Sequence, residues 1–254
     1  MKNFYEEFKD KKKSELNEDF IVACQKGNLD KIDYLINSPE LRFNVNPHYQ
    51  KGIALNIAIS HNHIDIIKYL SDPKKIKKTF DIKRYSIAFL TLACKEKDYE
   101  WLEELLPITD YSVSDLTNDC CMSGNVDMVK YLLNSPTWGK KITIDDGLLN
   151  NACSGGNVEL IDYLLKSQWK DNFDIHNDYD LPFLNCCEAA EFDTIKYFIF
   201  NLHIEKSSYI EEYLNDEPDQ FNKDVIELFN KRDLNNSLTE ILVENKENKR
   251  KNKI

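Results

Sequence analysis

Apolar residues recur along most of the chain at the spacing of an amphipathic helix. After Gly124 they stand at positions i, i+3, i+6 and i+7: Val126, Val129, Leu132 and Leu133. A run of small and apolar residues comes before each such segment and is separated from it by a Gly-Asn pair or a similar polar turn. This alternation predicts a helix, a tight turn and a second helix.

The helix-turn-helix pattern is an internal repeat. ACQKGNLDKIDYLINSP, beginning at Ala23, returns as CCMSGNVDMVKYLLNSP from Cys120 and as ACSGGNVELIDYLLKS from Ala152. Looser copies bring the number of similar segments to six, and these segments start at residues 23, 58, 93, 120, 152 and 186. Because one helix pair cannot cover its own apolar face, the pairs are expected to stack into a solenoid with one continuous core.

The residue that ends the first helix of each repeat has to turn the chain sharply. Glycine adopts the left-handed conformation without Cβ strain, and it occupies this position in three repeats, as Gly27, Gly124 and Gly156. Asparagine is the next best choice, and Asn62 stands there in the second repeat. Lys97 and Ala190 occupy the same position in the third and sixth repeats, where they are expected to strain the turn or loosen it.

Residues 18–200 resemble the ankyrin repeat family. The segment IALNIAISHNHIDIIKYL from Ile53 is similar to the family's TPLHxAAxxGHxxVVxLL, with Ala58 at the first alanine and His63 at the histidine. Pro182 falls on the family's proline. Asn-Ser-Pro at residues 37–39 and 134–136 replaces the family's G-A-x-x-N, so irregular loops are expected instead of β-hairpin fingers. The resemblance implies an all-α, ankyrin-like helix-turn-helix solenoid.

Three regions are expected along the chain. Residues 1–17 form an N-terminal extension or cap, and residues 18–230 form the ankyrin-like repeat domain. Its repeats start near residues 18, 51, 86, 114, 146 and 180, and an eroded helix pair over 205–230 serves as a C-terminal cap. Residues 231–254 are polar and end in a basic stretch, and they are expected to be a disordered tail.

Composition excludes several classes of protein. Forty-four acidic against 33 basic residues give a net charge of −11, the wrong sign for a general nucleic-acid binder. The seven glycines form neither G-x-G-x-x-G nor a P-loop, which excludes the usual dinucleotide enzymes and P-loop NTPases. The chain shows no apolar run of about 18 residues and no recognisable signal peptide, so we expect a cytoplasmic protein without membrane contact.

The reactive residue types are explained by packing. All seven cysteines lie at small, apolar positions of the repeat and show no C-x-x-C spacing, so they are expected to be buried, reduced thiols. The five histidines form no H-E-x-x-H. We therefore expect no catalytic residues, no metal and no cofactor.

Charged loops and loop aromatics are the candidate binding residues. Residues 74–84, the basic loop, hold six cations: Lys74, Lys75, Lys77, Lys78, Lys83 and Arg84. Residues 171–180, the acidic finger, hold four aspartates, and the two loops together would orient a partner. Aromatic residues that suit a protein interface gather in the loops: Tyr49, Tyr85, Tyr111, Trp138, Trp169, Phe173 and Tyr179. Either solvated loops or loop packing would explain the same residues.

The ankyrin resemblance implies a binding surface made of the finger loops and the exposed ends of the first helices. The residues at those ends are Gln25, Lys26, Ser60, His61, Lys95, Glu96, Met122, Ser123 and Glu188.

Three hypotheses for function follow. The first is a non-enzymatic protein-protein interaction scaffold that inhibits or adapts an unidentified protein, as some viral and phage ankyrin-like proteins do. The second is association with nucleic acid through the basic loop and tail. In its inverted form, the acidic body blocks a nucleic-acid-binding protein, since without the net +4 of residues 72–84 and the net +4 of residues 245–254 the chain carries −19. The third is an enzyme whose pocket the repeat does not reveal. The oligomeric state is left open.

Overall fold

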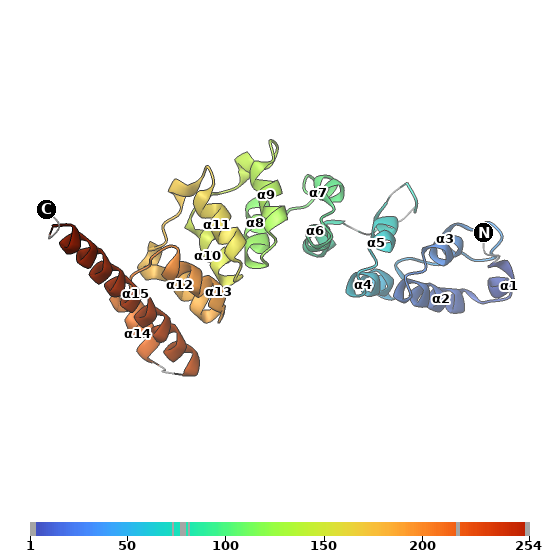
Figure 1. Cartoon of the computed structure of the whole chain (residues 1–254). Helices are drawn as coiled ribbons and strands as arrows, with labels where there is room; N and C mark the ends of the chain where they lie inside the picture. Colours follow the sequence, from blue (N-terminus) through green and yellow to red (C-terminus); the bar gives the residue numbers. More distant parts are fainter. Residues whose placement is uncertain (1–3, 73, 77–79, 81, 217–218, 252–254) are drawn as a thin grey trace. The chain divides into compact units, whose positions relative to one another are not determined.

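The fold consists of helices throughout the part of the chain that can be described. The computed structural model describes residues 4–72, 74–76, 80, 82–216 and 219–251. In these residues every regular element is an α-helix or a short 3-10 helix, and none is a strand (Figure 1). The helices group into two compact units, Met1–Tyr111 and Ser112–Ile254, which we call the first and the second unit. The prediction of an all-α fold of helix pairs is confirmed.

The first unit holds a short leading helix and three helix pairs. Helix α2 packs against α3, its partner in the pair, and against α4 of the next pair, while α4 packs against α5 and α6 against α7. The elements are α1 (Tyr5–Phe8), α2 (Lys13–Gln25), α3 (Leu29–Asn37), η1 (Tyr49–Gly52), α4 (Ile53–Ser60), α5 (Ile64–Ser71), η2 (Ile82–Tyr85), α6 (Ser86–Lys95) and α7 (Tyr99–Leu105).

The second unit holds three further repeat pairs and a final helix pair. Helix α10 packs against both α8 and α12, and each of these first helices packs against the second helix of its own pair. The elements are α8 (Val113–Met122), α9 (Val126–Asn134), η3 (Gly139–Lys141), α10 (Asp146–Ser154), α11 (Val158–Lys166), η4 (Lys170–Asn172), α12 (Asn177–Glu188), α13 (Phe192–Phe200), α14 (Ser208–Asp216) and α15 (Gln220–Lys251).

Each helix pair turns through a left-handed residue, as the sequence predicts. The backbone angle φ is +69° at Gly27 and +65° at Gly156. The next repeat explains why glycine is favoured: a Cβ added at Gly27 would lie 2.9 Å from the His63 ring, and one added at Gly156 would meet the Glu191 side chain. Three repeats accept a φ of +55° without glycine, at Asn62, Lys97 and Ala190.

The asparagine that follows the turn glycine caps the second helix. Its side-chain oxygen accepts a hydrogen bond from the backbone N–H three residues further on, at 3.0 Å for Asn28, 3.3 Å for Asn125 and 2.9 Å for Asn157. The Gly-Asn pair therefore ends one helix and starts the next, since each residue supplies one of the two local conformations.

The cysteines lie in the core, as predicted. All seven are free thiols, and all are buried. Burial raises the pKa of the Cys24 and Cys121 thiols to about 12, which keeps them protonated and unreactive at neutral pH. These thiols act as small apolar residues between neighbouring first helices.

The loops between repeats are irregular, as the replaced family motif predicts. Short 3-10 turns take the place of hairpins in the described loops, and polar side chains hold the loops against the helices. Asn44 donates from Nδ2 to the Ile36 carbonyl at 2.9 Å, and Ser114 accepts at Oγ from the Thr143 backbone N–H at 2.9 Å.

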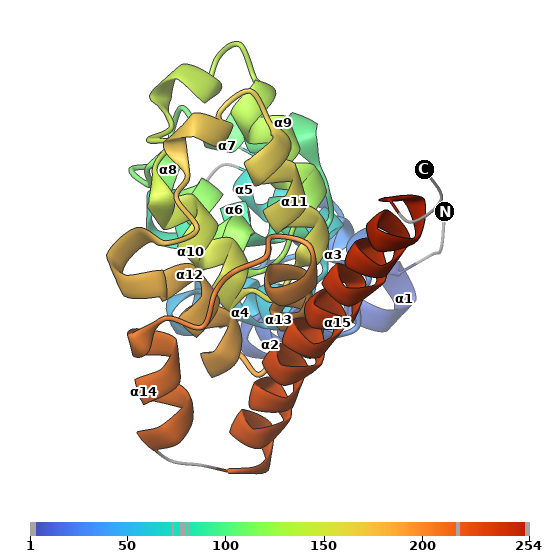
Figure 2. The same cartoon turned by 60° about the vertical axis from the view of Figure 1, so that its left-hand side comes forward.

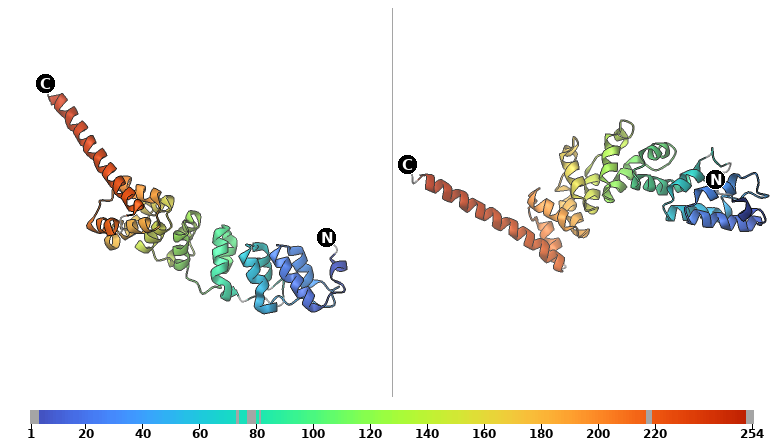
Figure 3. Two further views of the ribbon diagram at one scale, coloured as in Figure 1. Left: turned by 90° about the horizontal axis from the view of Figure 1, so that it is seen from below. Right: turned by 45° about the vertical axis from the view of Figure 1, so that its right-hand side comes forward.

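The C-terminal helix is longer than expected. Helices α14 and α15 lie beside α12 and α13 (Figure 2), where Val225 and Phe229 of α15 are buried. The helix then continues past this contact to Lys251 (Figure 3), whereas the sequence analysis expects a disordered tail from residue 231. The helical pattern continues beyond residue 231 because three apolar residues recur there at helical spacing: Leu234, Leu238 and Ile241.

Candidate functional site

The predicted binding residues of the first unit lie mostly at its surface. Lys26 and His61 are exposed at the ends of α2 and α4. In the basic loop, Lys83 Nζ lies 2.9 Å from Asp110 Oδ1, in an ion pair whose two side chains are largely solvated. The other exposed cations of that loop are Lys74, Lys75 and Arg84. Lys77 and Lys78 fall outside the described residues.

The loop aromatics of the first unit are half-buried and contribute to packing. The Tyr85 ring stacks on Phe89 with centroids 5.9 Å apart and meets the edge of Phe80 at 6.2 Å. It therefore fixes the end of the basic loop onto α6. Tyr49 and Tyr111 are half-buried as well, so little of their ring surface is available to a partner.

The predicted binding residues of the second unit divide into buried and exposed ones. Trp138 is only 7% exposed, so its interpretation as a partner contact is corrected: the ring packs its own loop, and Lys141 Nζ lies 4.6 Å from its centroid. Trp169 and Phe173 are half-buried. By contrast, Met122 is 54% exposed and Tyr179 is 61% exposed, so these two are available for binding.

The first helices present different surfaces in the two units. In the first unit, apolar residues are exposed on them, with Val22 at 39% and Ile87 at 59%. In the second unit, asparagines connect neighbouring first helices: Asn151 Nδ2 donates to Asn118 Oδ1 at 3.0 Å, and Asn185 Nδ2 donates to the Asn150 carbonyl at 3.4 Å. The row was not predicted from the sequence, in which Asn118 and Asn150 share one repeat position and Asn151 and Asn185 share the next.

The second helices use their polar residues to join repeats. Tyr69 donates to Asp33 of the preceding repeat at 2.5 Å, and Tyr197 donates to Asp162 in the same way. Burial and the neighbouring carboxylate raise the pKa of both phenols. These tyrosines act as packing residues, in agreement with their recurrence at one position of the repeat.

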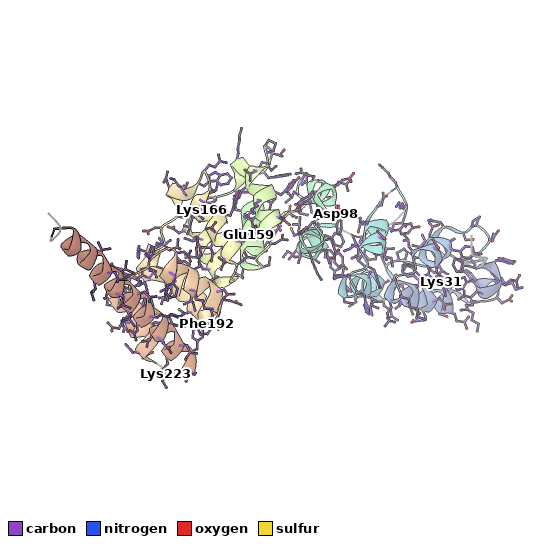
Figure 4. All side chains as sticks on the ribbon, in the orientation of Figure 1. Lys31, Asp98, Glu159, Lys166, Phe192 and Lys223 are labelled. Atoms are coloured by element: carbon purple, nitrogen blue, oxygen red, sulfur yellow. The ribbon has the colours of Figure 1, made fainter. Side chains whose placement is uncertain are left out.

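Ion pairs also cross between second helices. Lys130 Nζ lies 2.8 Å from Glu159 Oε1 of the next repeat, and Lys68 pairs with Asp98 of the repeat that follows it. Figure 4 shows Glu159 and Lys166 on α11 and Asp98 beside α7. Because these charges already have partners within the chain, the second helices are a poor choice for a binding surface.

A surface hollow lies where α12 and α14 begin, and we call it the tyrosine site. Its volume is about 620 Å³, and residues 176, 178–180 and 207–209 line it. The rings of Tyr179 and Tyr209 lie 4.5 Å apart at an angle of 45°. Of the residues predicted from sequence, Tyr179 and the aspartates Asp178 and Asp180 of the acidic finger belong to this site. No pattern in the sequence indicates that residues 176–180 and 207–209 meet.

A buried carboxylate supports the tyrosine site. Asp180 is 4% exposed, and its Oδ1 lies 2.7 Å from His176 Nδ1. Its Oδ2 accepts a hydrogen bond from the Ser207 hydroxyl. Ser, His and Asp occur together here, but the carboxylate lies between the other two. In a nucleophilic triad the histidine has to lie between serine and aspartate, so this arrangement does not activate Ser207.

The described residues contain neither a metal-binding cluster nor a membrane-spanning helix. Among them, no group of three or more His, Cys, Asp or Glu side chains could hold a metal ion. Within that same part of the chain, no helix has both the length and the apolar character needed to cross a membrane.

Charge is divided unevenly between the two units. Residues 1–111 contain 18 Lys and Arg and 18 Asp and Glu, so the first unit is neutral. Residues 112–254 contain 15 and 26, and therefore carry the whole net charge of −11. Five of the 15 basic residues lie in residues 244–254, so residues 112–243 contain 10 cations against 24 anions.

Comparison with known proteins identifies the repeat. The family model for ankyrin repeats matches residues 20–117 in three copies. No curated protein and no solved structure matches the chain. The repeats that start at residues 120, 152 and 186 lie beyond the matched segment and share its helix pairs and its left-handed turns. The predicted resemblance is confirmed over residues 20–117, which match the family of ankyrin repeats.

Proposed function

We propose that the protein is a non-enzymatic scaffold whose second unit binds a basic segment of a partner protein and thereby inhibits or recruits that partner. Ankyrin repeats are in general protein-protein interaction modules. The division of charge carries the proposal, because residues 112–243 hold 24 anions against 10 cations while the first unit is neutral. Such a field attracts and orients a basic partner before any contact forms.

The first helices of the second unit supply the contact surface. Met122 is exposed at the end of α8, and Asp115 and Glu188 are exposed on α8 and α12. The asparagine row that joins Asn118 to Asn151 holds these helices in place before binding. A partner therefore meets a surface that needs no folding, which lowers the entropic cost of association.

The experiment compares photocrosslinking from two positions in the second unit. A benzoyl-phenylalanine replaces Met122 on α8 or, as a control, Asp193 on the second helix α13. We expect a basic protein to crosslink from position 122 and not from position 193 after nuclease treatment of the lysate. Equal crosslinking from both positions, or none from either, would contradict the proposal.

A charge-matched pair of variants tests the role of the second unit directly. Asp115→Asn with Glu188→Gln removes two charges from first helices of the second unit. Glu18→Gln with Glu96→Gln removes two from the first unit. The first pair is expected to weaken crosslinking at position 122 about threefold or more at low salt, and the second pair to leave it unchanged. Recovery of nucleic acid instead of protein, lost on nuclease treatment, would favour the alternative that the basic loop binds a polyanion.

A further inference from the structure

We propose that the tyrosine site binds the cationic side chain of an arginine or lysine within the basic segment of the partner. The inference rests on the proposed function and specifies where on the second unit one such side chain is held. It starts from the two rings at the site. Tyr179 is 61% exposed and Tyr209 is 46% exposed, although their rings contact each other.

The backbone at the site is held in an unfavourable conformation. The backbone angle φ is +45° at Asp178, +62° at Tyr179 and +66° at Asp180, and none of these three consecutive residues is a glycine. Such a run persists only where surrounding contacts fix it. Here the strain presents the Tyr179 ring to solvent at the start of α12.

Asp180 supplies the contacts that fix this conformation. Its carboxylate is buried between His176 and the Ser207 hydroxyl, so it joins the start of α12 to the segment before α14. Tyr179 is the neighbour of Asp180, and Tyr209 lies two residues after Ser207. The same three-residue connection therefore sets the distance between the two rings.

The chemistry of the lining favours a cation. The faces of tyrosine rings attract ammonium and guanidinium groups, and arginine stacks on them especially well. Asp178 adds an exposed carboxylate at the rim, and the described lining contains no Lys or Arg. The nearby Lys206 is paired with Glu211, at 3.5 Å between Nζ and Oε1. Among the described lining residues, the one group that can carry a positive charge is His176, and its Nδ1 already faces the Asp180 carboxylate.

The shape of the site favours a side chain over a small free cation. Pockets for small molecules enclose most of their ligand, whereas this hollow is shallow and open to solvent. A side chain can enter it while the main chain of the partner stays outside, along the acidic surface of the second unit.

The test uses two short peptides and four forms of the full chain. The probes are fluorescein-labelled Gly-Arg-Gly-Arg-Gly and its neutral match Gly-Gln-Gly-Gln-Gly, with binding measured by fluorescence anisotropy. Tyr179→Phe keeps an aromatic face, Tyr179→Leu removes it, and Tyr5→Leu removes a partly exposed tyrosine of the first unit. We expect Tyr179→Leu to weaken binding of the arginine peptide about three- to tenfold, and the other two variants to bind within about twofold of wild type.

A direct readout identifies the site. Ring resonances of 13C-labelled tyrosine, assigned through Tyr179→Phe and Tyr209→Phe, are expected to shift with the arginine peptide and to stay unchanged with the glutamine peptide. Circular dichroism establishes that each variant is folded. Equal affinity of Tyr179→Leu and wild type, or equal shifts with both peptides, would overturn the inference.

The outcome separates this inference from the proposed function. Suppose that Tyr179→Leu binds the arginine peptide with the affinity of wild type, while Asp115→Asn with Glu188→Gln weakens binding of the peptide. The second unit then binds basic segments, and the tyrosine site is not involved. If neither change matters and position 122 gives no crosslink, both proposals fail.

Discussion

The first and second units are built from the same type of helix pair, but the residues that they expose to solvent differ. Both place cysteine or alanine between first helices, and both turn through a left-handed residue. Yet the first unit is neutral, with apolar Val22 and Ile87 exposed, whereas the second is acidic, with an asparagine row and an exposed tyrosine pair. The positions that determine the repeat are therefore few, and the remaining positions are free to determine a partner.

The repeats also differ in how closely their sequences resemble one another, and this difference does not change their fold. The repeats starting at residues 120 and 152 are close copies of the one starting at 23. The repeat at residue 93 departs from them and has Lys97 at its turn, but it forms the same helix pair with the same left-handed turn. A degenerate repeat can hence keep its fold as long as the buried positions and the turn are kept.

Removing one buried ring from each unit should have the largest effect on stability. Phe89 packs 5.7 Å from the Trp101 ring in the first unit, and Phe183 packs 5.7 Å from the Phe229 ring in the second. Each is fully buried, so Phe89→Ala or Phe183→Ala should cost about 3–5 kcal/mol.

Hydrogen exchange under mild urea is the measurement that tells the units apart. Because each ring lies within one compact unit, protection is expected to fall first in the unit that carries the substitution. An equal loss of protection in both units from either variant would show that the two units unfold together and are not separate in stability.

Exchanging the turn residues should have the next largest effect. Gly156→Ala places a Cβ against Glu191 in a left-handed turn, and we expect it to destabilise the second unit by about 1–2 kcal/mol. Lys97→Gly and Ala190→Gly remove an existing strain and should stabilise their units by up to about 1 kcal/mol. Urea midpoints measure all three, and a loss of stability in both glycine variants would contradict the role assigned to the turn.

The repeat was predictable because its signals are local. Glycine at the turn, the capping asparagine and the apolar spacing each act within a few residues, so Gly124 and Asn125 already indicate where one helix ends and the next begins. Recurrence across six copies then separates such positions from chance. The buried cysteines followed from the same register.

The tyrosine site and the asparagine row could not be predicted, because they depend on contacts between distant segments. Asp180 looks like one of several acids in a solvated loop, and only packing against Ser207 buries it. The aromatic loop residues share this difficulty: Trp138 and Tyr179 both follow a repeat, yet one ring is buried and the other exposed. Exposure at a loop is decided by what packs on it, which no single repeat contains.

Acid should weaken both units to a small and similar extent. Lys166 and Tyr197 hold the pKa of Asp162 in the second unit below its ordinary value. In the first unit, burial would raise the pKa of Asp98, but hydrogen bonds from Lys68 and the Trp101 N–H lower it overall. A lowered pKa stabilises the folded chain above the unfolded value of about 3.9, and this contribution disappears as the pH falls through the folded value.

Urea unfolding at pH 7 and pH 3 tests the contribution of the second unit. Asp162→Asn should lower stability at pH 7 by less than about 1 kcal/mol, since the ion pair is partly solvated, and should reduce the stability lost between the two pH values. Asp193→Asn on α13, whose side chain is more exposed, is the matched control and should leave both values unchanged. An unchanged pH dependence of stability in Asp162→Asn would show that this residue does not contribute to the loss of stability in acid.

The smallest effect is expected at the far part of α15. Leu234, Leu238 and Ile241 are each at least half exposed, beyond the contact that buries Phe229. Leu238→Glu should therefore change stability by no more than about 0.5 kcal/mol, whereas Phe229→Ala should cost several times as much. Thermal unfolding at two protein concentrations makes the result decisive, because a helix covered by another molecule would lose stability on this substitution and on dilution. An unaltered midpoint in both cases would instead show that α15 no longer contributes to the stability of the second unit at Leu238.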